Sequence, residues 1–98
     1  MIALLTLAIV GWVVLFVQNP TILLKARFRY IQATKIAKID LSNGPCLGEI
    51  ANSWVLDIAH LPRQEIDNLP ENQCSDYQTG RALHFVEMTP RGEVIVVR

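Results

Sequence analysis

The side chains with the most reactive chemistry are Cys46, His60, Cys74 and His84. Asp57 precedes His60 by three residues, so these two would share a face only on a helix. A metal site needs three or four convergent ligands, and no pair here has the spacing of a ligand motif. A cysteine nucleophile with a histidine base could be assembled from any such set, which is not a specific signal. The sequence therefore predicts no metal and no catalytic residue.

The five glycines, at positions 11, 44, 48, 80 and 92, do not form a phosphate-binding loop. Neither a GxGxxG pattern nor a GxxxxGK pattern followed by Ser or Thr occurs, and these are the spacings that bring backbone amides to a phosphate. We therefore expect no cofactor, no small-molecule substrate and no enzymatic activity. A membrane-tethered enzyme is kept as a third alternative.

The two cysteines lie 28 residues apart and have two possible states. In the cytoplasm they would remain free thiols, whereas in an oxidising compartment they could pair. Closing a loop of that length would stabilise the fold by about 3–4 kcal/mol in the chain-entropy model. We expect reduced thiols, because the basic residues that follow the apolar beginning of the chain place the domain in the cytoplasm.

The elements that would position these residues follow a long apolar beginning. Residues 2–17 are apolar at fourteen of sixteen positions, and no charged side chain precedes Lys25. About 20 helical residues cross the hydrocarbon layer, so we expect residues 1–24 to form a single transmembrane anchor. A buried core helix and a cleaved signal peptide are the alternatives. Trp12 lies in the middle of the run, away from the interfaces that Trp prefers, and is expected to face a partner helix.

The residues after the anchor are basic. Lys25, Arg27, Arg29, Lys35 and Lys38 all precede the first acidic residue, Asp40. The positive-inside rule then places the N-terminus outside and the C-terminal domain in the cytoplasm. Residues 25–34 are expected to form a basic juxtamembrane segment in contact with lipid headgroups. The residues predicted to lie at the membrane surface are Lys25, Arg27, Phe28, Arg29 and Tyr30.

The remaining residues, 39–98, contain nine acidic and four basic side chains, a formal charge of −5. Nucleic-acid surfaces need positive charge to displace counterions, so an acidic domain argues against a nucleic-acid partner.

Turn signals divide this part into short elements. Residues 21–34 fit a helix or a strand, because charged and apolar side chains alternate at residues 25–30 while Leu24, Phe28 and Ile31 have helical spacing. We expect a helix to about Gln32, a strand over residues 35–41 and a turn at residues 42–45. A strand at Trp54–Ile58 precedes a short helix that begins at Pro62 and ends before Pro70. Residues 70–80 read as a polar loop, and residues 82–88 and 93–98 as a β-hairpin. The predicted fold class is α+β, a transmembrane helix followed by a β-β-α-β-β domain over residues 35–98.

The last strand is apolar on both faces, with Val94, Ile95, Val96 and Val97 in succession. So small a domain can hardly cover both faces of a strand. One face is expected to pack on the domain's own helix around Ile66 and Leu69, and the other to bind a partner. Alternation predicts that Val94 and Val96 share one face, and Ile95 and Val97 the other.

These features predict a single-pass membrane protein that is a non-catalytic accessory or regulatory subunit. Its expected partners are the lipid bilayer and a larger membrane protein complex. The second reading is an anchored periplasmic or extracytoplasmic binding domain, stabilised by a disulfide between Cys46 and Cys74.

Overall fold

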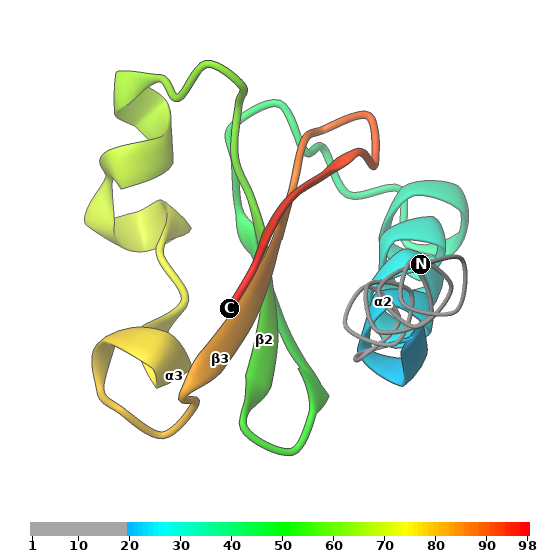
Figure 1. Cartoon of the computed structure of the whole chain (residues 1–98). Helices are drawn as coiled ribbons and strands as arrows, with labels where there is room; N and C mark the ends of the chain where they lie inside the picture. Colours follow the sequence, from blue (N-terminus) through cyan, green and yellow to red (C-terminus); the bar gives the residue numbers. More distant parts are fainter. Residues whose placement is uncertain (1–19) are drawn as a thin grey trace, which may run out of the picture.

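The computed structural model describes residues 20–98, in which one helix packs across a four-stranded mixed sheet (Figure 1). Helix α2 (Pro20–Ile31) continues into the π-helical turn η1 (Gln32–Ile36). The strands are β1 (Cys46–Ala51), β2 (Trp54–Ile58), β3 (His84–Met88) and β4 (Val94–Val97). Between β2 and β3 lie the short helices η2 (Glu65–Asn68), η3 (Pro70–Asn72) and α3 (Ser75–Gln78).

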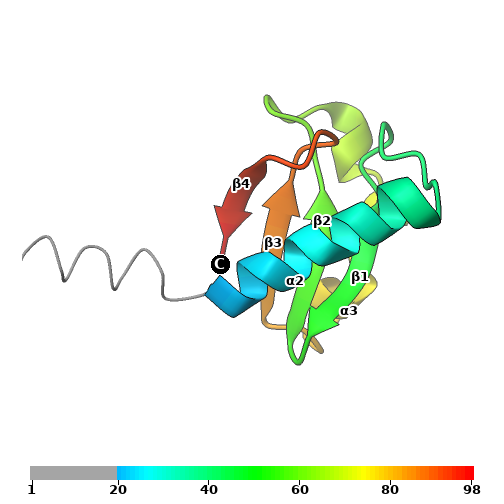
Figure 2. The same cartoon turned by 90° about the vertical axis from the view of Figure 1, so that its right-hand side faces the viewer.

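Helix α2 begins at Pro20, a residue suited to the first helical position because it has no amide hydrogen to leave unpaired. Its inner face is made by Ala26 and Ala33, seven residues apart and both 0% exposed. Small side chains at this spacing let the helix lie close to the sheet, and Figure 2 shows it crossing in front of β3, β2 and β1.

The strand predicted over residues 35–41 is wrong, because the helical path continues to Ile36 and residues 37–41 form no strand. The hydroxyl of Thr34 donates to the carbonyl of Tyr30, and the amide of Ala37 donates to the carbonyl of Gln32 at 2.9 Å. The helical path ends after Lys38 enters the left-handed region at φ 53°.

The sheet has the order β1-β2-β3-β4, with β2 and β3 parallel and the two outer pairs antiparallel. The predicted strand β2 and the predicted β3–β4 hairpin are confirmed. Strand β1 was not predicted. It contains Gly48 at φ 86° and two register shifts, one on each side of the Gly48–Glu49 step, so its side chains do not alternate in the sequence.

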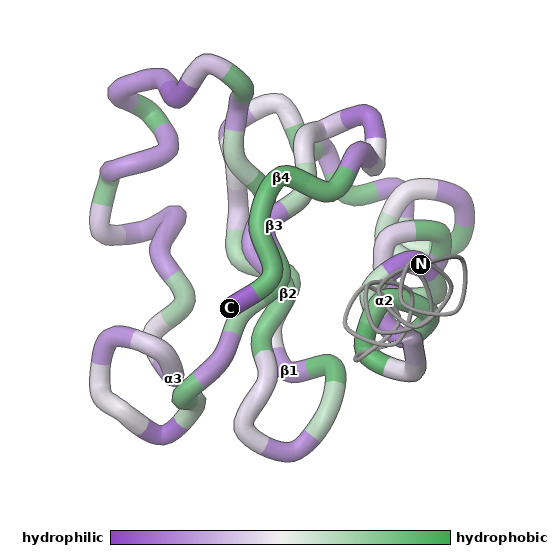
Figure 3. The backbone as a smooth tube through the Cα atoms, in the orientation of Figure 1, coloured by the Kyte–Doolittle hydropathy of each residue, from purple (hydrophilic) through white to green (hydrophobic). Residues whose placement is uncertain are grey.

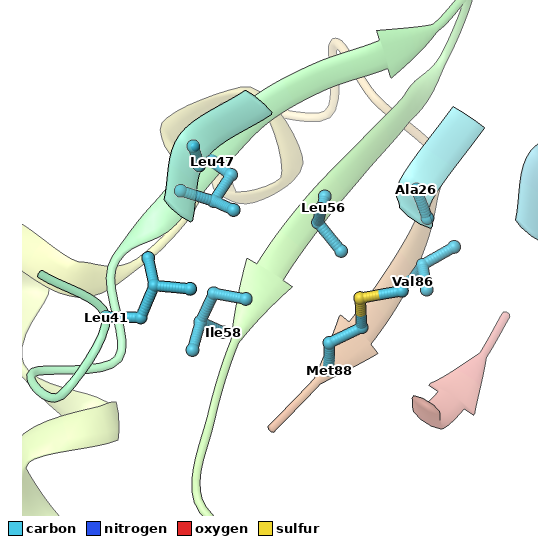
Figure 4. Close-up of a cluster of buried hydrophobic side chains, with 8 residues drawn as sticks. Ala26, Leu41, Leu47, Leu56, Ile58, Val86 and Met88 are labelled. Carbon is cyan, nitrogen blue, oxygen red and sulfur yellow. The ribbon is translucent and has the colours of Figure 1, made fainter. Parts of the chain in front are cut away.

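The main core lies between α2 and the sheet, where the side chains of three strands and of the loop before β1 converge (Figure 4). Its fully or nearly fully buried members are Ala26, Ala33, Leu41, Leu47, Leu56, Ile58, Val86 and Met88. In Figure 3 the strands carry most of the hydrophobic colour, whereas the connection from β2 to β3 is largely hydrophilic.

That connection, residues 59–83, covers the other face of the sheet, and Figure 1 shows its short helices opposite α2. A smaller cluster of Val55, Cys74 and Ala82 lies beneath it. The predicted helix from Pro62 is reduced to the 3-10 turn Glu65–Asn68, and the predicted polar loop contains two further helical turns. A parallel pair of strands needs a crossover, and this chain builds it from single turns.

The described residues thus form a small α+β domain with a four-stranded sheet and one main helix. Helix α2 spans the predicted domain boundary at residues 24–25, and Ala26 and Ala33 of the predicted juxtamembrane segment belong to the core. Within residues 20–98 no helix is both long and apolar enough to cross a bilayer. The predicted anchor over residues 2–17, including Trp12, lies outside the described residues.

Candidate functional site

The outer face of α2 carries an exposed apolar stripe. Leu24, Phe28 and Ile31 recur at helical spacing and are 68%, 69% and 52% exposed. Ala26 and Ala33 occupy the opposite face, so the helix is apolar on two sides and only one of them is covered by the sheet. Large apolar side chains that share one exposed helix face are a recognised sign of a binding surface.

Beside this stripe lies a groove of about 470 Å³ between α2 and the edge strand β1. Its lining combines apolar, basic and acidic side chains, namely Leu24, Lys25, Phe28, Arg29, Gln32, Glu49 and Ile50. The stripe and the groove together form one continuous face of the domain at the start of the described chain.

The five residues predicted to lie at the membrane surface occupy two different environments. Lys25, Arg27 and Phe28 are exposed, whereas Arg29 and Tyr30 are half-buried. Arg29 Nε donates to the carbonyl of Leu47 at 3.0 Å, and the Tyr30 hydroxyl donates to the carbonyl of Pro90 at 2.8 Å. These two side chains therefore fasten the helix to β1 and to the β3–β4 turn.

The turn between β3 and β4 is shaped around the Tyr30 ring. Gly92 has φ 90°, and a side chain at this position would collide with that ring. Glycine is therefore required here both by the backbone conformation and by the close approach of α2.

Strand β4 lies at one edge of the sheet, and all four of its residues are partly buried. A register shift opposite Glu87 and Met88 breaks the alternation, so Val94 and Val97 both pack against the core under α2. The predicted pairing of Val94 with Val96 on one face is therefore wrong, because Val94 packs together with Val97. The face of these two residues lies under α2, so the predicted packing on Ile66 and Leu69 does not apply to it. The partner-binding role of β4 stays a prediction.

The two cysteines form a disulfide bond, with their Cα atoms 5.0 Å apart. The expectation of two reduced thiols is therefore wrong. The β1–β2 hairpin places Cys46 beside β2, and the crossover returns over the same face at Cys74, so a separation of 28 residues becomes a direct contact. The bond joins β1 to a connection that has few buried apolar side chains of its own.

His60 pairs with Asp67, at a sequence separation that carries no motif. His60 Nδ1 lies 2.9 Å from Asp67 Oδ1, and the amides of His60 and Gln64 both donate to Asp67 Oδ2 at 2.9 Å. Burial alone would raise the pKa of Asp67, but the hydrogen bonds from Gln64 and His60 outweigh it and hold that pKa below its usual value. Gly44 lies against this carboxylate, and a side chain there would collide with it. The cluster fixes the chain where it leaves β2.

A second carboxyl group, Asp57, is buried in the middle of β2. It pairs in register with Glu87 on β3, and Arg63 Nη1 contacts Glu87 Oε2 at 3.0 Å. Burial first, and the charge of Glu87 second, raise the pKa of Asp57 to about 7. From the sequence, Asp57 was considered only beside His60 and not as a buried carboxyl group next to Glu87. The available signal was an acidic residue inside the otherwise apolar strand Trp54–Ile58.

His60 and Asp57 therefore do not form the pair that their spacing allowed, since each faces a different carboxylate. In the part of the chain that the structure describes, no three His, Cys, Asp or Glu side chains converge as metal ligands would. Comparisons with protein-family models, with curated proteins and with solved structures found no match.

Proposed function

We propose that this chain is a membrane-anchored, non-catalytic binding domain that faces an oxidising compartment as an accessory subunit of a larger membrane assembly. The observation that carries this proposal is the Cys46–Cys74 disulfide. Structural disulfides persist in secreted and periplasmic proteins and are rare in the cytoplasm, where thiols are kept reduced.

The basic residues after the anchor favour the opposite orientation, so the two signals have to be weighed. Arg29 is partly used inside the fold, where it donates to Leu47. The positive-inside rule counts Arg29 as one full positive charge, although its side chain is already hydrogen-bonded within the domain. The disulfide closes a loop and so stabilises a domain whose core is small. We therefore base the proposed orientation on the disulfide rather than on the basic residues.

The outer face of α2 supports contact with the bilayer. The uncharged apolar run ends three residues before Pro20, so an anchor that spans the membrane would deliver α2 to the headgroup layer. Leu24 and Phe28 would then enter the boundary between headgroups and acyl chains, while Lys25 and Arg27 would contact anionic lipid.

The edge strand β4 would remain available for a protein partner. Within residues 20–98 no further strand lies beside it, and an exposed sheet edge can accept a strand from another chain. In this arrangement the anchor and α2 fix the domain on the membrane, and Val94–Val97 stays our proposed partner-binding segment.

The test determines the compartment in intact cells that express the full chain. A variant with both cysteines changed to Ser and Thr79 changed to Cys carries one exposed thiol on the crossover. A membrane-impermeant maleimide should label it without lysis. Wild-type chain, denatured in the presence of a maleimide, should show no free thiol before reduction and two after it.

Labelling of the Thr79→Cys variant only after lysis, together with two free thiols in the wild-type chain, would reject the exported orientation. That result would restore a cytoplasmic accessory subunit, the orientation that the positive-inside rule predicts.

A further inference from the structure

The face of the sheet beneath the crossover contains two carboxyl groups side by side. Asp57 on β2 and Glu87 on β3 are register partners in the parallel pair, and Cys46 on β1 is the partner of Asp57 on its other side. Val55 and Phe85, two residues earlier on the same strands, extend this face.

The charges on this face do not balance. Arg63 pairs with Glu87 at 3.0 Å, which leaves Asp57 as the excess acid. Asp57 is only 9% exposed, and its Oδ1 atom has no hydrogen-bond partner among residues 20–98. An unpaired buried carboxyl oxygen is costly, so such an atom in a native fold calls for an explanation.

All elements packed around Asp57 contribute to its electrostatics. The titratable or charged groups near it are Glu87 on β3, Arg63 and Asp67 on the crossover, and Tyr77 on α3, while Cys46 is held in the disulfide. Burial, Glu87 and Asp67 raise the pKa of Asp57 to about 7, while Arg63 and a backbone hydrogen bond from Ile58 oppose them. The carboxyl group is thus poised to ionise near neutral pH when a cation joins it.

A small cavity of about 70 Å³ opens at this carboxyl group. Its lining consists of Val55, Asp57, Cys74, Tyr77, Phe85 and Glu87. Tyr77 and Phe85 meet edge to face with ring centroids 4.9 Å apart. Aromatic rings beside a carboxylate attract cations, and a space of this size admits a few non-hydrogen atoms but not a sugar or a nucleotide.

We propose that this cavity binds a primary alkylammonium group, with Asp57 as its anionic partner and the aromatic pair Tyr77 and Phe85 as its wall. The group supplies the single positive charge that the cluster of Asp57, Glu87 and Arg63 lacks. A divalent metal is a poorer fit, because no third acidic, histidine or cysteine ligand converges within the described residues. The site does not depend on which side of the membrane the domain faces.

Binding is coupled to a proton. At neutral pH part of the Asp57 population carries a proton, and the ammonium ion displaces it as the ion pair forms. Because the pKa is about 7, Asp57 is mostly ionised at pH 8 and mostly protonated at pH 5.5. Affinity for the ammonium group should therefore be roughly 30-fold higher at pH 8 than at pH 5.5.

The experiment uses the full chain, isotope-labelled, in uncharged maltoside micelles. Methylammonium chloride and Nα-acetyl-lysine amide are titrated separately, with sodium chloride at equal ionic strength as the reference. We expect saturable shifts of the Val55, Tyr77 and Phe85 amides at pH 8, weakened about 30-fold at pH 5.5. Binding of both amines would point to a lysine side chain as the natural ligand, and binding of methylammonium alone to a small free amine.

The matched variants are Asp57→Asn, which removes the proposed anion, and Glu71→Gln, which removes an exposed carboxylate on η3. Asp57→Asn should abolish saturation, while Glu71→Gln should bind as wild type does. If Asp57→Asn does not fold, the pH dependence of the wild-type chain decides. Shifts that match those in sodium chloride, an affinity that does not change with pH, or undiminished binding by a folded Asp57→Asn variant would overturn the proposal.

Discussion

The two faces of the sheet are held together by different means. Under α2 the contacts are apolar and close, with Leu56, Ile58, Val86 and Met88 all 0% exposed. Under the crossover the apolar cluster is small. The contacts there are mainly the Cys46–Cys74 disulfide, the hydrogen bonds from backbone amides to Asp67, and the ion pair between Arg63 and Glu87.

This difference follows from the covering elements. Helix α2 and the η1 turn present a continuous face, and Ala26 and Ala33 on that face bring it close to the strands. The crossover consists of single helical turns, which have few side chains to place against the sheet. A domain of this size has a marginal core, so covalent and polar contacts on the second face add stability that apolar burial cannot supply.

The strongest test of the comparison changes neighbouring residues of β2 that point to opposite faces. Leu56→Ala should lower the free energy of unfolding by about 2–5 kcal/mol, because it opens a cavity in the main core. Val55→Ala should cost less, because fewer methyl groups are lost and the crossover can relax into the space. Urea unfolding of the full chain in micelles measures both. Equal losses would mean that the two faces are packed equally well.

Removing the disulfide should have the next largest effect. The Cys46→Ser, Cys74→Ser double variant is expected to lose about 3–4 kcal/mol, since its unfolded state regains the freedom of the open loop. A reducing agent should lower the urea midpoint of the wild-type chain and leave that of the double variant unchanged. If reduction does not change the stability of the wild-type chain, apolar burial also dominates the crossover face.

The buried carboxyl group should give the crossover face a pH dependence. Because the folded-state pKa of Asp57, about 7, exceeds its unfolded value, the folded chain binds the extra proton between about pH 4 and 7. Stability should therefore fall as the pH rises through this range, and the full penalty should be present above pH 7.

Asp57→Asn should remove this loss and be more stable than the wild-type chain at pH 8, by up to a few kcal/mol. Thermal unfolding at pH 5 and pH 8 for both chains, without added amine, makes the comparison. An identical pH dependence in the two chains would show that Asp57 is not the titrating group.

The smallest expected effect on stability concerns two aromatic residues of α2 that lie on different faces of the helix. Tyr30→Phe should cost about 0.5–1.5 kcal/mol, because the hydrogen bond to Pro90 is lost. Phe28→Ala should change stability by less than about 0.5 kcal/mol, since Phe28 is 69% exposed.

In bilayer nanodiscs that contain anionic lipid, spin-labelled lipid should broaden the α2 resonances of the wild-type chain. Phe28→Glu should weaken this broadening, and Tyr30→Phe should not. A Phe28→Glu variant broadened as strongly as the wild type would show that the exposed stripe does not contact lipid.

The sequence by itself determined the elements that local patterns specify. Strand β2 follows from its β-branched and aromatic residues, and the β3–β4 hairpin from the turn that ends at Gly92, whereas the spacing of Leu24, Phe28 and Ile31 favoured a helix to about Gln32 without excluding a strand. The acidic character of residues 39–98 and the apolar run before α2 are likewise properties of composition.

Only the tertiary structure decided the contacts between distant segments. Strand β1 depends on its pairing with β2, because Gly48 and two register shifts remove its alternation. The disulfide, the pairing of His60 with Asp67 and the position of Asp57 beside Glu87 all require the crossover to return over the sheet. Local propensity acts over a few residues, whereas Asp57 and Glu87 are 30 residues apart, and such contacts form only when the apolar faces of the helix and the sheet are buried together.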